Sequence, residues 1–113
     1  MEIAVSSTGK DTNSDVADVF GRCPYFIIAE IKDKKIEKTE AIENKSINQT
    51  SGAGVSASQS VAERNVSAVI TKNIGPRALD VLGQFDIEIY AGDGMIKDVL
   101  QDFMDGKLKK MDK

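Results

Sequence analysis

The sequence predicts an α/β fold in which helices cover both faces of a mixed β-sheet. Two observations support this prediction. The first half of the chain holds the two arms of a β-hairpin, and the second half alternates short apolar strands with helical segments. A hairpin followed by strand–helix alternation combines antiparallel and parallel strands in one sheet, because each helix returns the chain to start a parallel strand. The expected element order is β-β-β-α-β-α-β-α.

Three strands are expected in the N-terminal part of the chain. Residues Glu2–Ser6 form a short, mostly apolar strand. Tyr25–Ile31 is rich in β-branched and aromatic residues, which is typical of a strand. After a tight turn at Asp33, Lys35–Ile42 returns as the second arm of the hairpin, and its alternating charges suit an edge strand.

Two strand–helix units and one leading helix are expected in the rest of the chain. The first helix begins near the Gly-Ala-Gly of residues 52–54 and continues to about Arg64, and Pro76 opens the second. Strands are expected at residues 67–71 and 86–90. The final helix shows the clearest i, i+3, i+4, i+7 apolar pattern, formed by Ile96, Val99, Leu100 and Phe103.

Composition limits the class of protein and its partners. A chain of 113 residues has the size of one domain, so residues 1–113 are predicted to be a single unit. With 41% hydrophobic and 29% charged residues, a soluble globular protein is expected, and a formal charge of -3 argues against nucleic-acid binding. No apolar stretch approaches the roughly 20 residues of a membrane helix, and one cysteine gives no internal disulfide. A cytoplasmic location is therefore expected.

Lysines near the C-terminus are expected to solvate a helix end and complement its dipole. They are Lys107, Lys109, Lys110 and Lys113.

The chain has no histidine, which removes the commonest acid–base group and the commonest metal ligand. We therefore expect a protein that is not an enzyme. The carboxylates of Asp11, Asp15 and Asp18 suggest a divalent-metal site only if their segment is helical, because then they would share one face. Their composition indicates a loop, so solvated side chains are the better interpretation.

Glycines at the start of two predicted helices form the main candidate binding site. Ligands of open α/β sheets bind beyond the carboxyl ends of parallel strands, and helix N-termini attract anions. Gly52, Ala53, Gly54 and Gly75 would expose backbone N–H groups there, and Arg22 and Arg77 lie in glycine-containing loops beside them. The alternative is structural: the glycines make tight turns, and the arginines form surface ion pairs with acidic residues.

Cys23, in the segment Phe20–Phe26 (FGRCPYF), is the one candidate metal ligand among the site residues. The neighbouring Arg22 would lower the pKa of the thiol, and thiolates bind soft metals. A single thiolate cannot hold a cluster alone, so such a site would need further ligands from outside the chain. The alternative is a buried thiol that packs as a small hydrophobic group.

Four segments together resemble the dinitrogenase iron–molybdenum cofactor biosynthesis family, which includes NifX-like proteins and the C-terminal part of NifB. They are FGRCPYF at 20–26, GAG at 52–54, IGPRAL at 74–79, and AGDG at 91–94 leading into a helix that ends DFMDGKLK. The resemblance covers essentially the whole chain. It implies a ribonuclease H-like fold with a five-stranded sheet of order 3-2-1-4-5, in which strand 2 is antiparallel.

The resemblance also implies a non-catalytic binding or carrier protein for an iron–molybdenum cofactor or an iron–sulfur precursor, with a cofactor-assembly protein as partner. One departure affects the expected ligands. Many relatives carry a histidine before the first helix, where this chain reads Asn48–Gly54 (NQTSGAG). Imidazole ligation is therefore impossible. The alternative function is a binding or regulatory module for a small anion or nucleotide-like ligand that keeps the fold without a metal cluster.

Overall fold

The computed structural model describes residues 1–111, and they form one six-stranded mixed sheet with helices on both faces. The strands are β1 (Glu2–Ser7), β2 (Tyr25–Lys32), β3 (Lys35–Glu43), β4 (Ala68–Thr71), β5 (Glu88–Ala91) and β6 (Lys109–Met111). The helices are α1 (Ala53–Ala62), α2 (Pro76–Gln84), α3 (Ile96–Met104) and a single 3₁₀ turn, η1 (Phe20–Arg22). The predicted α/β class, mixed sheet and three α-helices are confirmed.

The strand order is β3-β2-β1-β4-β5-β6, and β1 lies near the centre of the sheet. It pairs antiparallel with β2 and parallel with β4, and β4 pairs parallel with β5. After β1 the chain continues to β2 on one side of the sheet centre, and after β4 it continues to β5 on the other side. The strand order therefore reverses between β1 and β4. In open α/β sheets, such a reversal opens a crevice at the carboxyl ends of the strands.

The prediction of five strands is wrong, because β6 adds a sixth strand antiparallel to β5. Lys109 pairs with Ala91, and Met111 pairs with Ile89. Lys109 and Lys110 therefore lie in a strand rather than at a helix end, while Lys113 lies outside the described residues. A three-residue strand with two lysines has neither the length nor the alternation that identifies a strand in a sequence.

The β2–β3 hairpin turns at Asp33 and Lys34, whose φ angles are 53° and 61°. Positive φ at both central residues is what the two-residue turns of tightly twisted hairpins require. β3 forms one edge of the sheet, and nearly all of its side chains are exposed. The predicted edge strand is confirmed.

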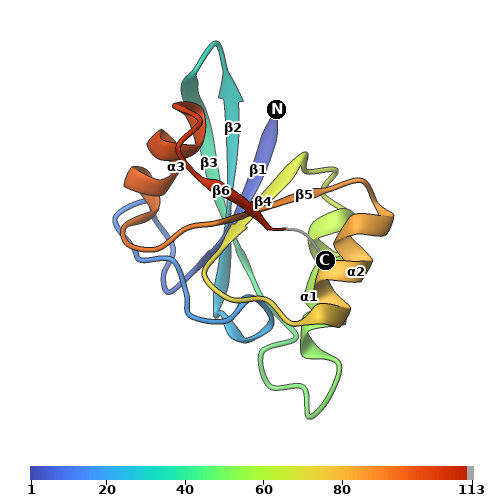
Figure 1. Ribbon diagram of the computed structural model, residues 1–113. Coiled ribbons are helices and arrows are strands. Elements are labelled where there is room, and N and C mark those ends of the chain that lie inside the picture. The colour runs from blue at the N-terminus through green and yellow to red at the C-terminus, as the bar shows by residue number, and fades with distance from the viewer. Residues whose placement is uncertain (112–113) are drawn as a thin grey trace.

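Two hydrophobic clusters lie on opposite faces of the sheet. Figure 1 shows α1 and α2 on one face and α3 on the other. Side chains of β1 alternate between the clusters, because Ala4 belongs to the first and Ile3 and Val5 to the second. The first cluster, which we call the α1–α2 core, includes Phe20, Cys23, Phe26, Ala57, Val61, Val69, Ala78 and Leu82. The second, the α3 core, includes Val16, Ile27, Ile70, Ile96, Val99 and Leu100.

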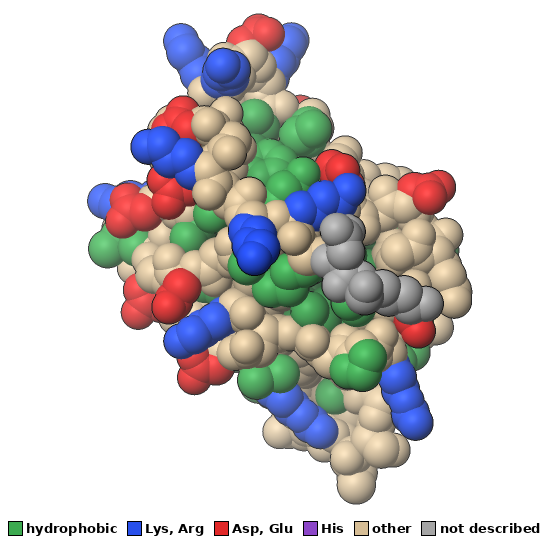
Figure 2. Space-filling view, viewed as in Figure 1, with side chains coloured by type: hydrophobic (Ala, Val, Ile, Leu, Met, Phe, Trp, Pro, Cys, Tyr) green, Lys and Arg blue, Asp and Glu red, His purple; other side chains and the backbone are tan. Residues whose placement is uncertain are grey.

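The described surface mixes positive and negative side chains. On the face shown in Figure 2, lysine and arginine side chains alternate with aspartate and glutamate around a central group of hydrophobic side chains. No broad basic patch of the kind that binds a phosphate backbone is visible on this face. No helix within residues 1–111 is long and apolar enough to cross a membrane.

Candidate binding site

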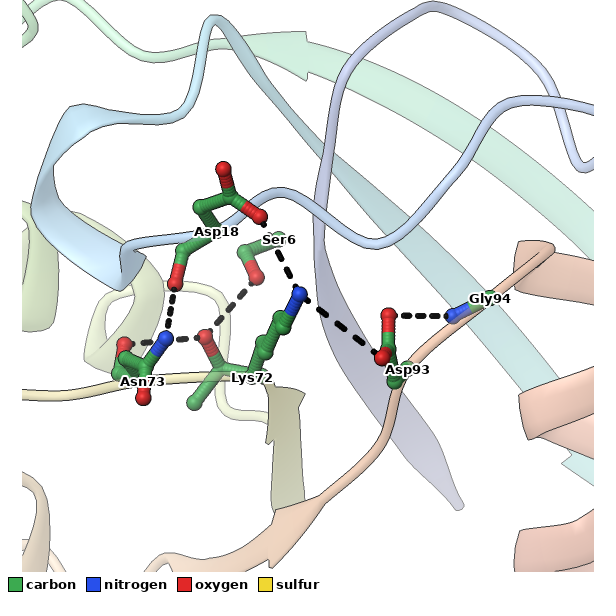
Figure 3. Close-up of polar contacts among 7 residues, drawn as sticks. Ser6, Asp18, Lys72, Asn73, Asp93 and Gly94 are labelled. Atoms are coloured by element: carbon green, nitrogen blue, oxygen red, sulfur yellow. Dashed lines mark hydrogen bonds and ion pairs between the residues drawn. The ribbon is translucent and has the colours of Figure 1, made fainter.

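Three loops meet at the carboxyl ends of β1, β4 and β5, and Lys72 links them. Its Nζ lies 3.4 Å from Oδ1 of Asp18 and 3.7 Å from Oδ2 of Asp93 (Figure 3). Asp18 follows β1, Lys72 follows β4 and Asp93 follows β5. The ammonium group therefore joins the ends of three neighbouring segments. Exposed pairs of this kind contribute little energy, so other contacts must hold the loops in place.

Hydrogen bonds hold η1 against the loop between β4 and α2. The amide of Phe20 donates to the carbonyl of Asn73 at 2.9 Å, and the Asn73 side chain donates to the carbonyl of Asp18 at 2.9 Å. Below them, the buried hydroxyl of Ser6 donates to that of Thr71 at 2.9 Å, joining β1 to β4 (Figure 3). η1 is thus fixed beside the N-terminus of α2.

A cavity of about 390 Å³ lies between η1 and the N-termini of α1 and α2. Its volume is in the range that holds small ligands. Its lining consists mostly of backbone and small apolar side chains, together with two arginines. The lining residues are Val19, Gly21, Arg22, Gly52, Ala53, Gly54, Val55, Gly75, Pro76, Arg77 and Ala78. Six of the seven predicted site residues therefore line one cavity, and Cys23 does not.

Glycines allow the three walls of this cavity to approach closely. A Cβ on Gly21 would lie 2.7 Å from the backbone nitrogen and Cα of Gly54, so η1 can contact α1 only without a side chain there. A Cβ on Gly54 would lie 3.2 Å from Cβ of Ala78, which brings α1 against α2. Gly52 has a φ of 72°, a conformation that favours glycine. Tight packing thus explains part of the Gly-Ala-Gly motif.

The N-termini of α1 and α2 both open onto this cavity. No side chain caps either helix, and neither has an acidic residue in its first turn. The first amides to bond back are Ser56, to Gly52, and Leu79, to Gly75. Within residues 1–111, the amides of Ala53, Gly54, Val55, Arg77 and Ala78 meet no protein acceptor. Such amides and the helix dipoles favour a negative group in the cavity.

Among residues 1–111, the only charged side chains that line the cavity are those of Arg22 and Arg77. Nη1 of Arg22 donates to the carbonyls of Ile47 at 2.9 Å and Gln49 at 2.7 Å, which fastens the loop before α1 to η1. Arg77 forms no ion pair among residues 1–111. The ion pairs with acids that were the structural alternative do not occur there for either arginine. The cavity is therefore a positively charged site in a protein of net charge -3.

Cys23 lies in the α1–α2 core, with only 1% of its surface exposed. Its thiol donates to the carbonyl of Phe20 at 3.1 Å. Burial raises the pKa of the thiol from 9.0 to about 12, and this effect outweighs the hydrogen bonds to Ser7 and Asn44, which lower it. The expectation that Arg22 would lower this pKa is wrong, because the guanidinium lies on the surface and the sulfur points into the core. Metal ligation by Cys23 stays a prediction, and burial disfavours it.

Direct metal coordination has little support elsewhere in the described chain. Within residues 1–111, no group of three or more Cys, Asp or Glu side chains is arranged to hold a metal ion. Asp11, Asp15 and Asp18 lie in a loop rather than on one helical face, as their composition indicates. The donors at the cavity are N–H groups, which bind anions and not metal cations.

The comparison with protein families shows which family the chain belongs to. The family described as dinitrogenase iron-molybdenum cofactor matches residues 1–106. The chain belongs to this family. Among relatives of this dinitrogenase iron–molybdenum cofactor domain, an uncharacterised protein of Methanocaldococcus jannaschii is 37% identical over 101 residues, covering 88% of this chain and 86% of that protein.

Solved structures share the same architecture. The apo form of the orange protein from Desulfovibrio gigas superimposes with a TM-score of 0.90 at 25% identity, covering 97% of this chain and 92% of that one. A Thermotoga protein assigned as NifB gives a TM-score of 0.82 at 30% identity, covering 96% and 91%. Both matches cover more than nine tenths of this chain, so the overall architecture is shared along almost its whole length.

Sequence reasoning identified both arginines and the helix-opening glycines but missed other parts of the site. Val19, Gly21 and Val55 also line the cavity, and Lys72 joins its neighbouring loops. Gly21 lies inside FGRCPYF, but the segment alone does not show its contact with Gly54. The signal for Lys72 was its place directly after a buried strand, at the sheet edge where ligands gather.

Proposed function

We propose that this protein is a non-catalytic carrier that holds an anionic metallocluster as cargo in the cavity between η1, α1 and α2. The cargo is an iron–molybdenum cofactor or an iron–sulfur precursor of it, and the partner that supplies or receives it is a cofactor-assembly protein. Membership of the family supports this class of cargo. The ribonuclease H-like description implied by the resemblance stays a prediction about shape and is not needed for this proposal.

The observation that carries the proposal is the convergence of two uncapped helix N-termini and two arginines on one cavity, to which residues 1–111 contribute no acidic side chain. Arg77 and Arg22 would bind the negative charge of the cargo, and the amides of α1 and α2 would donate hydrogen bonds to its sulfide or oxygen atoms. The apolar side chains Val19 and Val55 would cover the body of the cluster.

The donor set fits a cluster that arrives complete. Within the described part of the chain, no side chain lining the cavity is a thiolate, imidazole or carboxylate, so these residues offer no bond to a metal atom there. Binding would be through charge and hydrogen bonds alone. A carrier with this property releases its cargo without breaking a bond between the protein and a metal atom. Such binding and release require no group for acid–base catalysis.

A second candidate, a binding module for a small anion, rests on the same N–H donors, because these groups accept oxygen anions as well as sulfide anions. The two candidates differ in the preferred ligand. A metallocluster carrier prefers the isolated cofactor and tetrathiomolybdate, whereas an oxyanion or nucleotide module prefers phosphate, molybdate or a nucleotide.

Anaerobic titration with these five ligands, followed by absorption spectra and thermal unfolding, tests the proposal. A bound ligand raises Tm with concentration, because stabilisation grows as RT ln(1 + [L]/Kd). We expect binding of the cofactor and tetrathiomolybdate, weakened at least tenfold in Arg77→Ala and by high salt. Arg64→Ala is the matched control, because Arg64 pairs with Glu40 away from the cavity. Equal affinity of wild type and Arg77→Ala for every ligand would overturn the site.

A further inference from the structure

Gly75 differs from the other glycines that line the cavity, because neither close packing nor a positive φ requires a glycine at this position. Gly21 and Gly54 are needed for close packing, and Gly52 for its positive φ. A Cβ added to Gly75 would meet no atom within 4 Å. Its φ of -73° and ψ of 160° are those of extended backbone, which any residue adopts before a proline.

Glycine at this position also leaves a helix end unsatisfied. Gly75 is the N-cap of α2, where Ser, Thr, Asp or Asn would accept a hydrogen bond from the first turn and stabilise the helix. The amides of Arg77 and Ala78 consequently stay open toward the cavity. The residue thus weakens the fold slightly and contributes nothing to its packing.

We propose that Gly75 is a specificity-determining position, whose missing side chain leaves the space in which an anionic edge of the cargo lies against the amides of α2. This inference rests on the proposed function and adds to it the point of closest approach. The cargo then contacts backbone at Gly75, while Arg77, two residues further along the chain, balances its charge. A side chain at residue 75 would occupy the same space.

Two substitutions of Gly75 should weaken ligand binding without weakening the fold to a similar extent. Gly75→Ala should bind tetrathiomolybdate at least tenfold more weakly. Its Tm should change by no more than about 4 °C, because alanine is a poorer N-cap than glycine but restricts the unfolded chain. Gly75→Asp should raise Tm and abolish binding, because its carboxylate would cap α2 and take the place of the ligand's anionic group.

Gly83→Ala is the matched control. Gly83 lies in the same helix, a Cβ there would also meet no atom within 4 Å, and it does not line this cavity. Its replacement should raise Tm by about 4 °C, because alanine favours the helix interior, and leave the Kd for tetrathiomolybdate unchanged.

The experiment measures Tm and the Kd for tetrathiomolybdate and inorganic phosphate in wild type, Gly75→Ala, Gly75→Asp, Gly83→Ala and Arg77→Ala. Wild-type affinity in Gly75→Ala, together with weak binding in Arg77→Ala, would overturn this inference and leave the proposed function standing. A Tm lowered by much more than about 4 °C in Gly75→Ala would also overturn it, because glycine would then be required by the fold. No binding of either probe or of isolated cofactor by wild type would overturn the proposed function and this inference together.

Discussion

The helices on the two faces of the sheet begin in different ways. At α3, the amides of Ile96 and Lys97 donate to the carbonyls of Ser14 and Thr12 at 2.9 Å, so the loop after β1 caps the helix. At α1 and α2, the first-turn amides meet no acceptor within residues 1–111. The chain therefore has a means of closing a helix end and uses it on one face only. The open ends are the ones that meet at the cavity.

Close packing at glycines occurs on both faces, and the open space at Gly75 is local to the cavity. Gly92, beside α3, allows close contact, because a Cβ there would lie 2.6 Å from Cγ2 of Ile70. Gly75, beside α2, has empty space around it. Because a Cβ on Gly21 would lie almost as close, 2.7 Å, to the backbone of Gly54, the two faces differ in how their helices are capped and not in overall packing.

The strongest test of this comparison removes a large side chain from the α3 core. Leu100 is fully buried in it, so Leu100→Ala should lower the free energy of unfolding by about 3 kcal/mol through lost contacts and a residual cavity. Urea unfolding measures the loss. Affinity for tetrathiomolybdate, measured well below Tm, should not change. Arg77→Ala should show the reverse pattern, and a shared loss of affinity in both variants would mean that the two faces are not independent.

A methyl group at the tightest contact of the cavity should affect both properties. Gly21→Ala would force η1 away from the α1 backbone and destabilise the fold by roughly 2 kcal/mol. Because this contact forms a cavity wall, ligand affinity should fall too. Calorimetric unfolding and ligand titration on the same sample check both effects. Unaltered stability would show that η1 can shift without loss.

Cys23 provides a test of its burial that depends on pH. Its pKa is raised to about 12 in the folded protein against 9.0 for an ordinary thiol, so above pH 9 the unfolded chain loses a proton that the folded chain retains. Stability present below pH 9 is therefore lost progressively up to about pH 12. By pH 10.5 the loss is about 2 kcal/mol.

Urea unfolding of wild type and Cys23→Ala at pH 8 and pH 10.5 isolates this effect, since other groups titrate equally in both. Wild type should lose about 2 kcal/mol more than the variant over this interval. Parallel pH dependence in the two proteins would contradict a buried neutral thiol and return Cys23 to consideration as a thiolate ligand.

The smallest effect is expected at Lys72. Lys72→Met removes the two exposed ion pairs with Asp18 and Asp93 and should cost about 0.5 kcal/mol at low salt. The difference from wild type should disappear in 1 M salt, where charges are screened. A difference that persists at high salt would indicate a packing role for the lysine stem.

Most elements could be predicted from the sequence, because their patterns are local. The apolar spacing of Ile96, Val99 and Leu100 gave α3, and Pro76 marked the start of α2. β6 could not be predicted, because Lys109–Met111 becomes a strand through pairing with β5 and not through its own pattern. η1 is a single turn whose position depends on contacts with α1.

The candidate site was predictable in part for a similar reason. Arg77 and Gly75 could be placed at a helix start from the Gly-Pro-Arg sequence alone. The relation between Arg22 and Cys23 could not, because adjacency in sequence does not show that one side chain faces solvent and the other the core. The contact of Gly21 with Gly54 joins residues on separate elements, which no local pattern reveals.

The central position of β1 has a consequence for the order in which the protein folds. The β2–β3 hairpin can close one edge of β1 early, because its partners lie close in sequence. The other edge must wait for β4, whose Thr71 meets Ser6 across 65 residues. Such distant pairings are slow, since loop closure precedes the contacts that reward it. During synthesis, the cavity walls are complete only once α2 has emerged, so the cavity forms only after most of the chain has been made.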